Sequence, residues 1–108
     1  MAWCVETLNT VVDAELEAIP VDMRARFRHI SGLIEEFGLE QVREPHAKHL
    51  RGPLWEMRMK GKSGISRALY VTAVGRRVLG VRVFMKKTQK TPNREIELAL
   101  KRAKEISR

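Results

Sequence analysis

The sequence has a single cysteine, Cys4, and no long run of apolar residues. One thiol cannot form an internal disulfide, and it cannot supply a cysteine-rich zinc site. No apolar run approaches the roughly 20 residues that a helix needs to cross a bilayer. Residues 1–10 contain no lysine or arginine, so the basic start of a secretion signal is missing. We therefore expect a cytoplasmic protein with no membrane partner.

Acidic residues are scarce in the middle of the chain. Residues 43–90 contain thirteen basic side chains and two acidic ones, whereas residues 1–42 contain three basic and eight acidic side chains. The net charge is +8, and 44% of the 108 residues are hydrophobic, which suits one folded domain over residues 1–108. A basic stretch of this density is typical of a protein that binds a polyanion, usually nucleic acid.

The first half of the chain predicts a short strand followed by two helices. Residues 3–8 are rich in strand formers. Thr10 is a suitable cap for a first helix, which Pro20 ends, and Asp22 is a suitable cap for a second helix, which ends at Gly38. We expect the two helices to form an antiparallel hairpin. Apolar residues at three- and four-residue spacing predict the core side of the second helix: Met23, Phe27, Ile30, Ile34 and Phe37.

The second half predicts three strands and a last helix. Period-two patterns and β-branched residues indicate strands over 54–59, 67–74 and 78–85, and their short connections favour an antiparallel meander. Thr91 and Pro92 are suitable first residues for a closing helix. The order β-α-α-β-β-β-α predicts an α+β domain in which a helical hairpin and a C-terminal helix cover one face of a small antiparallel sheet. The other face would then be polar and open.

Basic side chains gather on the predicted open face. Glu56, Arg58 and Arg82 have the parity opposite to the apolar residues of their strands, and Tyr70 lies on the less apolar side of its own strand. Phe84 shares the polar parity and is placed to stack on a base. These groups predict a concave surface that binds several phosphates. The loops and strand ends add five lysines to it: Lys60, Lys62, Lys86, Lys87 and Lys90.

Such a surface suits cleavage of RNA by the ribose 2′-hydroxyl. Attack on the adjacent phosphorus needs a proton acceptor, stabilisation of the phosphate charge, and a proton donor for the leaving 5′-oxygen. Arginine suits the charge stabilisation, and lysine crowded by other cations suits proton exchange because its pKa is lowered. Glu56 is either a base or the salt-bridge partner of Arg58. His46 and His49 have no evident further metal ligand, so we expect contacts with solvent or RNA, and no cofactor.

Two segments of the basic region resemble a known family. Residues 48–58, KHLRGPLWEMR, are similar to a K-x-L-x-G-x-L-W-E-x-R segment, and residues 84–92, FMKKTQKTP, to an F-x-K-K-T-x-K-T-P signature. Both resemble phage-derived, HigB-type toxins of the RelE/ParE superfamily, and with the element order the resemblance covers residues 5–106. It implies a RelE-like, microbial-RNase-like fold.

The resemblance also implies a function. Toxins of this kind belong to type II toxin–antitoxin systems. They are endoribonucleases, or mRNA interferases, that cleave mRNA without a metal, often on the ribosome, and so inhibit translation and arrest growth. The implied partners are therefore mRNA and a cognate antitoxin, usually a helix-turn-helix protein.

The resemblance finally implies roles for single residues. Arg67 resembles a strand arginine that contacts the scissile phosphate, Arg58 a further phosphate-binding arginine, and Lys86 and Lys87 the basic residues at the end of the last strand. By strict alternation Arg67 shares the apolar parity of Leu69, so we expect a strand start or a bulge to turn it to the open face. The predicted catalytic residues are Arg58, Arg67, Tyr70, Lys86 and Lys87, and the predicted RNA-binding residues are Lys60, Lys62, Arg82, Phe84 and Lys90.

Two other functions stay open at this point. A ParE-like toxin of the same fold would poison a protein such as DNA gyrase, and its basic loops would bind protein rather than RNA. A nucleic-acid-binding module without catalysis would carry the same basic residues. The Lys86–Lys87 pair favours the endoribonuclease over the ParE-like toxin.

Overall fold

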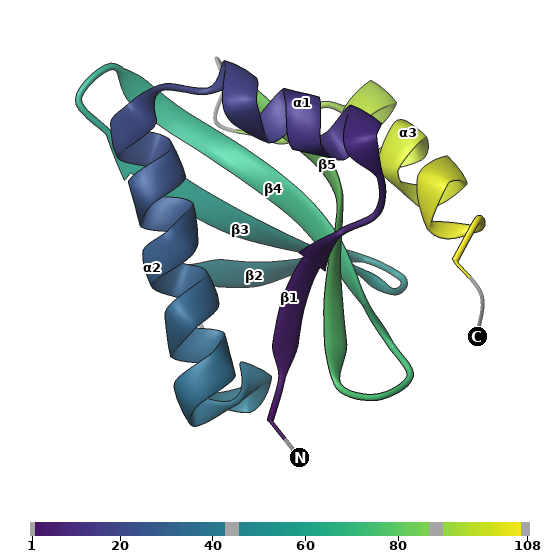
Figure 1. Cartoon of the computed structure of the whole chain (residues 1–108). Helices are drawn as coiled ribbons and strands as arrows, with labels where there is room; N and C mark the ends of the chain where they lie inside the picture. The colour runs from purple at the N-terminus through teal and green to yellow at the C-terminus, as the bar shows by residue number, and fades with distance from the viewer. Residues whose placement is uncertain (1, 43–45, 87–89, 107–108) are drawn as a thin grey trace.

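The computed structural model describes residues 2–42, 46–86 and 90–106. Over these residues the chain forms helices packed on a five-stranded sheet (Figure 1). The predicted α+β class is therefore confirmed. The elements, in chain order, are β1 (Cys4–Thr7), α1 (Thr10–Ala18), α2 (Val21–Phe37), the 3-10 turn η1 (Leu39–Gln41), β2 (Ala47–Arg51), β3 (Leu54–Gly61), β4 (Gly64–Ala73), β5 (Arg77–Lys86) and α3 (Asn93–Ala103).

The sheet is mixed rather than purely antiparallel. Its strand order is β1-β5-β4-β3-β2, and β2 to β5 are antiparallel neighbours. For β3, β4 and β5 this confirms the predicted meander. The exception is β1, which pairs parallel with β5, so that Cys4 lies opposite Arg77. Two helices and three strands separate β1 from β5 in the chain, so no hairpin turn forces these strands to run in opposite directions.

One strand, β2, was not predicted. It forms the outer edge of the sheet and pairs with β3, with His49 opposite Trp55. Its sequence, AKHLR, is mostly charged and polar, which is typical of an edge strand that must not pair with another chain. Gly52 connects β2 to β3 with a φ of 54°, a conformation that glycine adopts without steric cost.

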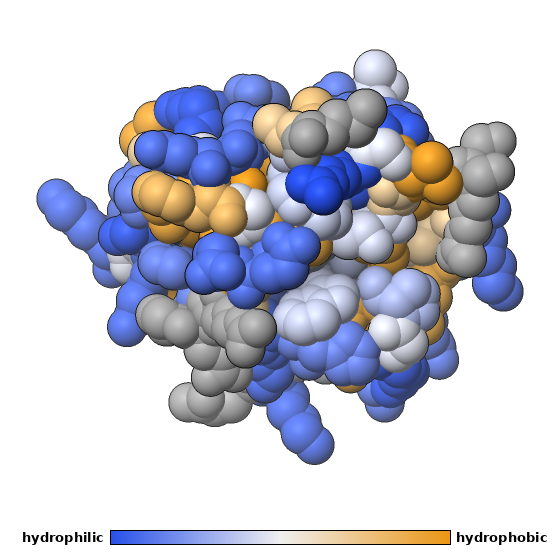
Figure 2. Space-filling view, turned by 90° about the horizontal axis from the view of Figure 1, so that it is seen from below, coloured by the Kyte–Doolittle hydropathy of each residue, from blue (hydrophilic) through white to orange (hydrophobic). Residues whose placement is uncertain are grey.

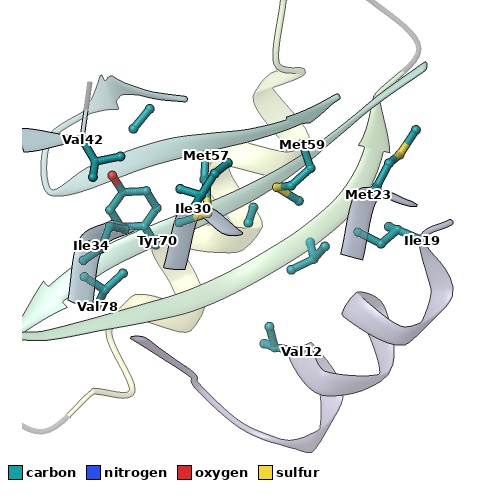
Figure 3. Close-up of a cluster of buried hydrophobic side chains, with 13 residues drawn as sticks. Val12, Ile19, Met23, Ile30, Ile34, Val42, Met57, Met59, Tyr70 and Val78 are labelled. Carbon is teal, nitrogen blue, oxygen red and sulfur yellow. The ribbon is translucent and has the colours of Figure 1, made fainter. Parts of the chain in front are cut away.

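Both faces of the sheet carry a hydrophobic cluster. On the first face, α1 and α2 cover strand residues such as Met57 and Tyr70 (Figure 3). On the second face, α3 covers Leu69 and Val71, the neighbours of Tyr70 along β4. Because successive side chains of a strand point to opposite faces, α2 and α3 must lie on opposite sides of the sheet. The predicted arrangement, with every helix on one face and the other face open, is wrong.

A β-bulge in β5 changes which side chains share a face. The register with β4 shifts so that Leu69 lies opposite Arg82 and Tyr70 lies opposite Gly80, which leaves Val81 as an extra residue. Val81 therefore faces α3, whereas Val83 belongs to the cluster under α2. Uninterrupted alternation along β5 would place both valines on one face, and the bulge prevents this.

The helix ends agree with the sequence in part. Asn9, rather than Thr10, caps α1, and its side-chain oxygen accepts a hydrogen bond from the Val12 amide at 3.1 Å. Asp22 does not cap α2 but accepts a hydrogen bond from the Lys62 amide at 2.8 Å, which ties the helix to the β3–β4 loop. Gly38 ends α2 as predicted. Within the described ranges, no helix is long and apolar enough to cross a membrane.

The apolar stripe of α2 is largely confirmed. Met23, Ile30 and Ile34 are buried in the cluster on the first face, and Phe27 packs against it. Phe37, however, is the last residue of the helix and is 58% exposed.

Candidate active site

A buried carboxylate organises the centre of the second face. Glu56 on β3 is fully buried and accepts hydrogen bonds from Arg67 on β4, from Nε of Arg58 at 3.3 Å, and from the hydroxyl of Thr91 just before α3. Arg58 and Arg67 lie directly opposite each other in the strand register. One carboxylate therefore holds two guanidinium groups, and the cluster keeps a net positive charge.

Arg67 reaches this cluster without a bulge at its position. It shares the face of Leu69, as strict alternation requires, and Glu56 and Arg58 lie on that same face. The expected strand start or bulge at Arg67 is wrong because the apolar residues of β4 on this parity pack under α3, not under α1 and α2. The predicted antiparallel hairpin of these two helices is also wrong, because α1 and α2 do not lie side by side (Figure 1). Burial lowers the pKa of the Arg67 guanidinium, and the Glu56 carboxylate opposes that shift. Arginine starts so far above neutrality that Arg67 stays charged.

Arg58 is the more accessible arginine of the pair. Its side chain is 30% exposed, compared with 6% for Arg67. It also lines a hollow of about 280 Å³ together with Arg26, His46, Lys60 and Ile65. The geometry therefore divides the two arginines into one held in the interior and one that solvent and ligands can reach.

The surroundings of Glu56 decide between its two predicted roles. The carboxylate has no exposed surface, and three donors already occupy it. A general base must lie within hydrogen-bond reach of the proton that it removes. Glu56 is thus the salt-bridge partner of Arg58 and Arg67, and it holds their guanidinium groups in place.

Tyr70 does not lie on the open face where the sequence placed it. It is 1% exposed, and its ring lies beside Ile34 and Val78 in the core under α2 (Figure 3). Burial raises the pKa of its phenol to about 12, so the hydroxyl is neutral at physiological pH. The sheet separates Tyr70 from Arg67, and the predicted grouping of these two side chains is wrong.

Arg82 and Phe84 are also not on an open surface. Arg82 forms ion pairs with Glu95 on α3 at 2.7 Å and with Glu15 on α1 at 2.8 Å. The hydrogen bond that Arg82 donates to Glu95 is the main cause that raises the pKa of Arg82. Phe84 is 9% exposed in the cluster under α3, with the Arg82 guanidinium 5.6 Å from its ring centre. The predicted exposed placement of both residues is wrong, because α3 packs over this part of the sheet.

Of the predicted lysines, Lys60 lines the hollow beside Arg58. Lys60, Lys62 and Lys90 are exposed. The main chain of Lys86 ends β5 opposite Ile65, one of the residues that line the hollow. Lys87 lies outside the described residues. The sequence analysis missed Arg26, because this residue sits on a helix in the acidic front of the chain and only the fold brings it to the basic strands.

A larger cavity of about 770 Å³ lies on the first face, beyond the end of α2. Its lining includes the aromatic residues Trp3, Trp55 and Tyr70. His49 packs its ring against Trp55 at 5.2 Å and bonds to the Gly52 carbonyl oxygen at 2.7 Å. Figure 2 views this end of the molecule, where hydrophobic residues form small patches separated by hydrophilic ones. The cavity and the Glu56 cluster lie on opposite faces of the sheet.

A metal site requires several ligand side chains that lie close together. Among the residues that the structure describes, no three His, Cys, Asp or Glu side chains group closely enough to hold a metal ion.

The fold and the arrangement of the site define a RelE-like α+β protein. A chain of the archaeal RelE–RelB complex from Pyrococcus horikoshii is similar in structure with a TM-score of 0.57 and 19% sequence identity, and the match covers 79% of this chain and 96% of that chain. The family model described as phage derived protein Gp49-like (DUF891) matches residues 14–104. The chain therefore belongs to the Gp49-like family. The predicted RelE-like fold is confirmed. No curated protein matches the sequence.

Proposed function

We propose that this chain is the toxin of a type II toxin–antitoxin pair and that it cleaves mRNA without a metal. The observation that carries the proposal is the Arg58–Arg67 pair, which a single buried carboxylate holds on adjacent strands. The RelE-like fold and the Gp49-like family support the same function.

In this proposal the two arginines have different tasks. Arg58 is accessible and binds the scissile phosphate, where its planar fork stabilises the charge that develops as the 2′-hydroxyl attacks. Arg67 is buried, holds the Glu56 carboxylate in position, and adds positive potential at the phosphate that Arg58 binds. We propose proton exchange for Lys86, and the register of its main chain opposite Ile65, which lines the hollow with Arg58, supports this. Lys87 stays a predicted partner of Lys86.

The proposal includes a protein partner that blocks the site. The structurally similar archaeal protein was crystallised in a RelE–RelB complex. We extend this to the present chain and propose a cognate antitoxin, for which the sequence resemblance implies a helix-turn-helix protein. Growth arrest by the expressed chain should be relieved when the antitoxin is expressed with it.

The direct test is cleavage of mRNA in a translating extract. Arg58→Ala should lose activity by about 10²-fold or more, because it removes charge stabilisation of the transition state. Tyr70→Phe should cleave like the wild type, since its hydroxyl lies on the other face of the sheet. Lys101→Ala, an exposed change on α3, is the matched control. Circular dichroism should show that all three variants are folded.

The negative outcomes point to the alternatives. If folded wild-type protein arrests growth while every transcript stays whole, the ribonuclease proposal is wrong and the target is a protein such as DNA gyrase. If it binds RNA but neither cleaves it nor arrests growth, it is a binding module without catalysis.

A further inference from the structure

A second basic site adjoins Arg58 at the edge of the sheet. The hollow of about 280 Å³ lies between α2 and β3 and is lined by Arg26, His46, Arg58, Lys60 and Ile65. Three of these residues are always cationic near neutral pH, and none of the lining residues is acidic. All the charged side chains that line the hollow are therefore positive.

The fold creates this hollow where the edge strand begins. β2 starts at Ala47, and the amide of Arg58 on β3 donates a hydrogen bond to the His46 carbonyl oxygen at 2.8 Å. Beyond Arg58, β3 continues to Gly61. Among the described residues, this last part of β3 pairs only with β4. There α2 packs closely, since a Cβ on Gly61 would lie 2.6 Å from the Asp22 carboxylate. Arg26, one turn after Asp22, is thereby brought to the strand edge.

The cations of the hollow lack the carboxylate partners that other arginines have. Arg24, Arg77, Arg82 and Arg102 each form an ion pair with a glutamate. Within the described parts of the chain, Arg26 and Lys60 form none. Arg58 shares its one carboxylate, Glu56, with Arg67. Like charges in one pocket repel each other, and an anionic ligand removes this cost.

We propose that this hollow binds a backbone phosphate of single-stranded RNA, next to the phosphate at the Arg58–Arg67 pair. Arg58 belongs to both sites, so they fit neighbouring phosphates of one strand. Arg26 supplies a planar fork for phosphate oxygens, Lys60 supplies a point charge, and the His46 ring supplies an N–H donor in either tautomer. The inference rests on the proposed function for the identity of the polymer, but not for the binding of its phosphate.

The test uses an RNA that the protein binds but does not cleave. A 2′-O-methyl oligoribonucleotide of eight residues lacks the attacking hydroxyl, and its binding is measured by fluorescence anisotropy at several salt concentrations. Arg26→Gln should weaken binding about tenfold and reduce the salt slope by about 0.7, the value for one phosphate contact on a single strand. His46→Gln should weaken binding about threefold, as loss of one donor at a partly exposed site.

The matched control is Arg28→Gln, the same change at an exposed position of the same helix. Arg28→Gln should bind within twofold of the wild type. Inorganic phosphate, added as a competitor, distinguishes a general anion site from a polymer site: it should displace the oligonucleotide only at millimolar concentrations. If it binds as tightly as the oligonucleotide, the site takes a free anion and the proposal is wrong.

The outcomes separate this inference from the proposed function. Equal binding by the Arg26→Gln and Arg28→Gln variants overturns the phosphate site even if the wild type cleaves mRNA. Failure of the wild type to bind the oligonucleotide overturns it as well. If Arg26→Gln loses binding and no mRNA is cleaved, the phosphate site stands and the ribonuclease proposal falls.

Discussion

At the scale of single residues, the main feature is a carboxylate that is completely buried among cations. Glu56 has no exposed surface, and the Arg67 side chain beside it is 6% exposed. Taking both charges out of water is costly, and their attraction together with the hydrogen bonds from Arg58 and Thr91 offsets that cost. The pair therefore fixes the position of the site more than it stabilises the fold.

This argument predicts a strongly non-additive mutant cycle. Arg67→Met alone leaves a buried carboxylate with too few partners and should cost about 3–5 kcal/mol of unfolding free energy. Glu56→Leu alone should cost a similar amount, because it leaves Arg67 buried without its carboxylate. The double variant should recover most of the loss, since it replaces an ion pair by apolar groups of similar volume. Chemical denaturation measures all three, and simple addition of the two single costs would contradict the argument.

The same residues show what the sequence can and cannot predict about the site. Glu56 and Arg58 lie in the K-x-L-x-G-x-L-W-E-x-R segment, and the family resemblance pointed to Arg67. The structure brings the three side chains together. Tyr70 was misplaced because alternation assigns a side chain to one of two faces without saying which face is covered. Arg26 could not be found at all, since its place in the site depends on how α2 crosses the edge of β3.

At the scale of elements, local patterns predicted the helices better than the edges and faces of the sheet. The three- and four-residue spacing of α2 and the terminal Gly38 are local signals, and both were confirmed in the structure. The edge strand β2 carries polar residues that hide its period of two, and the bulge in β5 reverses the parity after Val81. Neither feature has a signal in the sequence, because both depend on pairing with a neighbouring strand.

The position of α3 makes a prediction at this scale. Arg82 joins β5 to Glu95 of α3 and Glu15 of α1, so it acts as a link between elements and not as part of the RNA surface. Arg82→Met should lower the unfolding free energy by about 1.5–3 kcal/mol, the range for hydrogen bonds to charged groups. The folded variant should bind the 2′-O-methyl oligonucleotide as the wild type does.

Thermal unfolding and anisotropy measure the two effects separately. Lys101→Met, at an exposed position of α3, is the control and should change neither. Weaker RNA binding with unchanged stability would return Arg82 to the RNA-binding role that the sequence analysis gave it.

At the scale of the whole molecule, the acidic front and the basic middle of the sequence partly neutralise each other. Glu6 pairs with Arg77, whose hydrogen bond lowers the pKa of that carboxyl group, and Glu15 pairs with Arg82 and Arg102. The basic excess is therefore not spread over the whole stretch of residues 43–90. Part of it lies on Arg58, Lys60 and Lys62, which line the hollow or belong to the loop after β3.

The salt dependence of RNA binding tests this distribution. Each phosphate contact on a single strand contributes about −0.7 to the slope of log K against log salt concentration, so three or four contacts predict a slope of about −2 to −3. The double variant Lys60→Gln/Lys62→Gln should make the slope less negative by about 1.4. Arg77→Gln removes a charge from the same basic stretch, but Glu6 already neutralises it, so the slope should not change. Equal slope changes for the two variants would show that net charge alone, and not its placement by the fold, governs RNA binding.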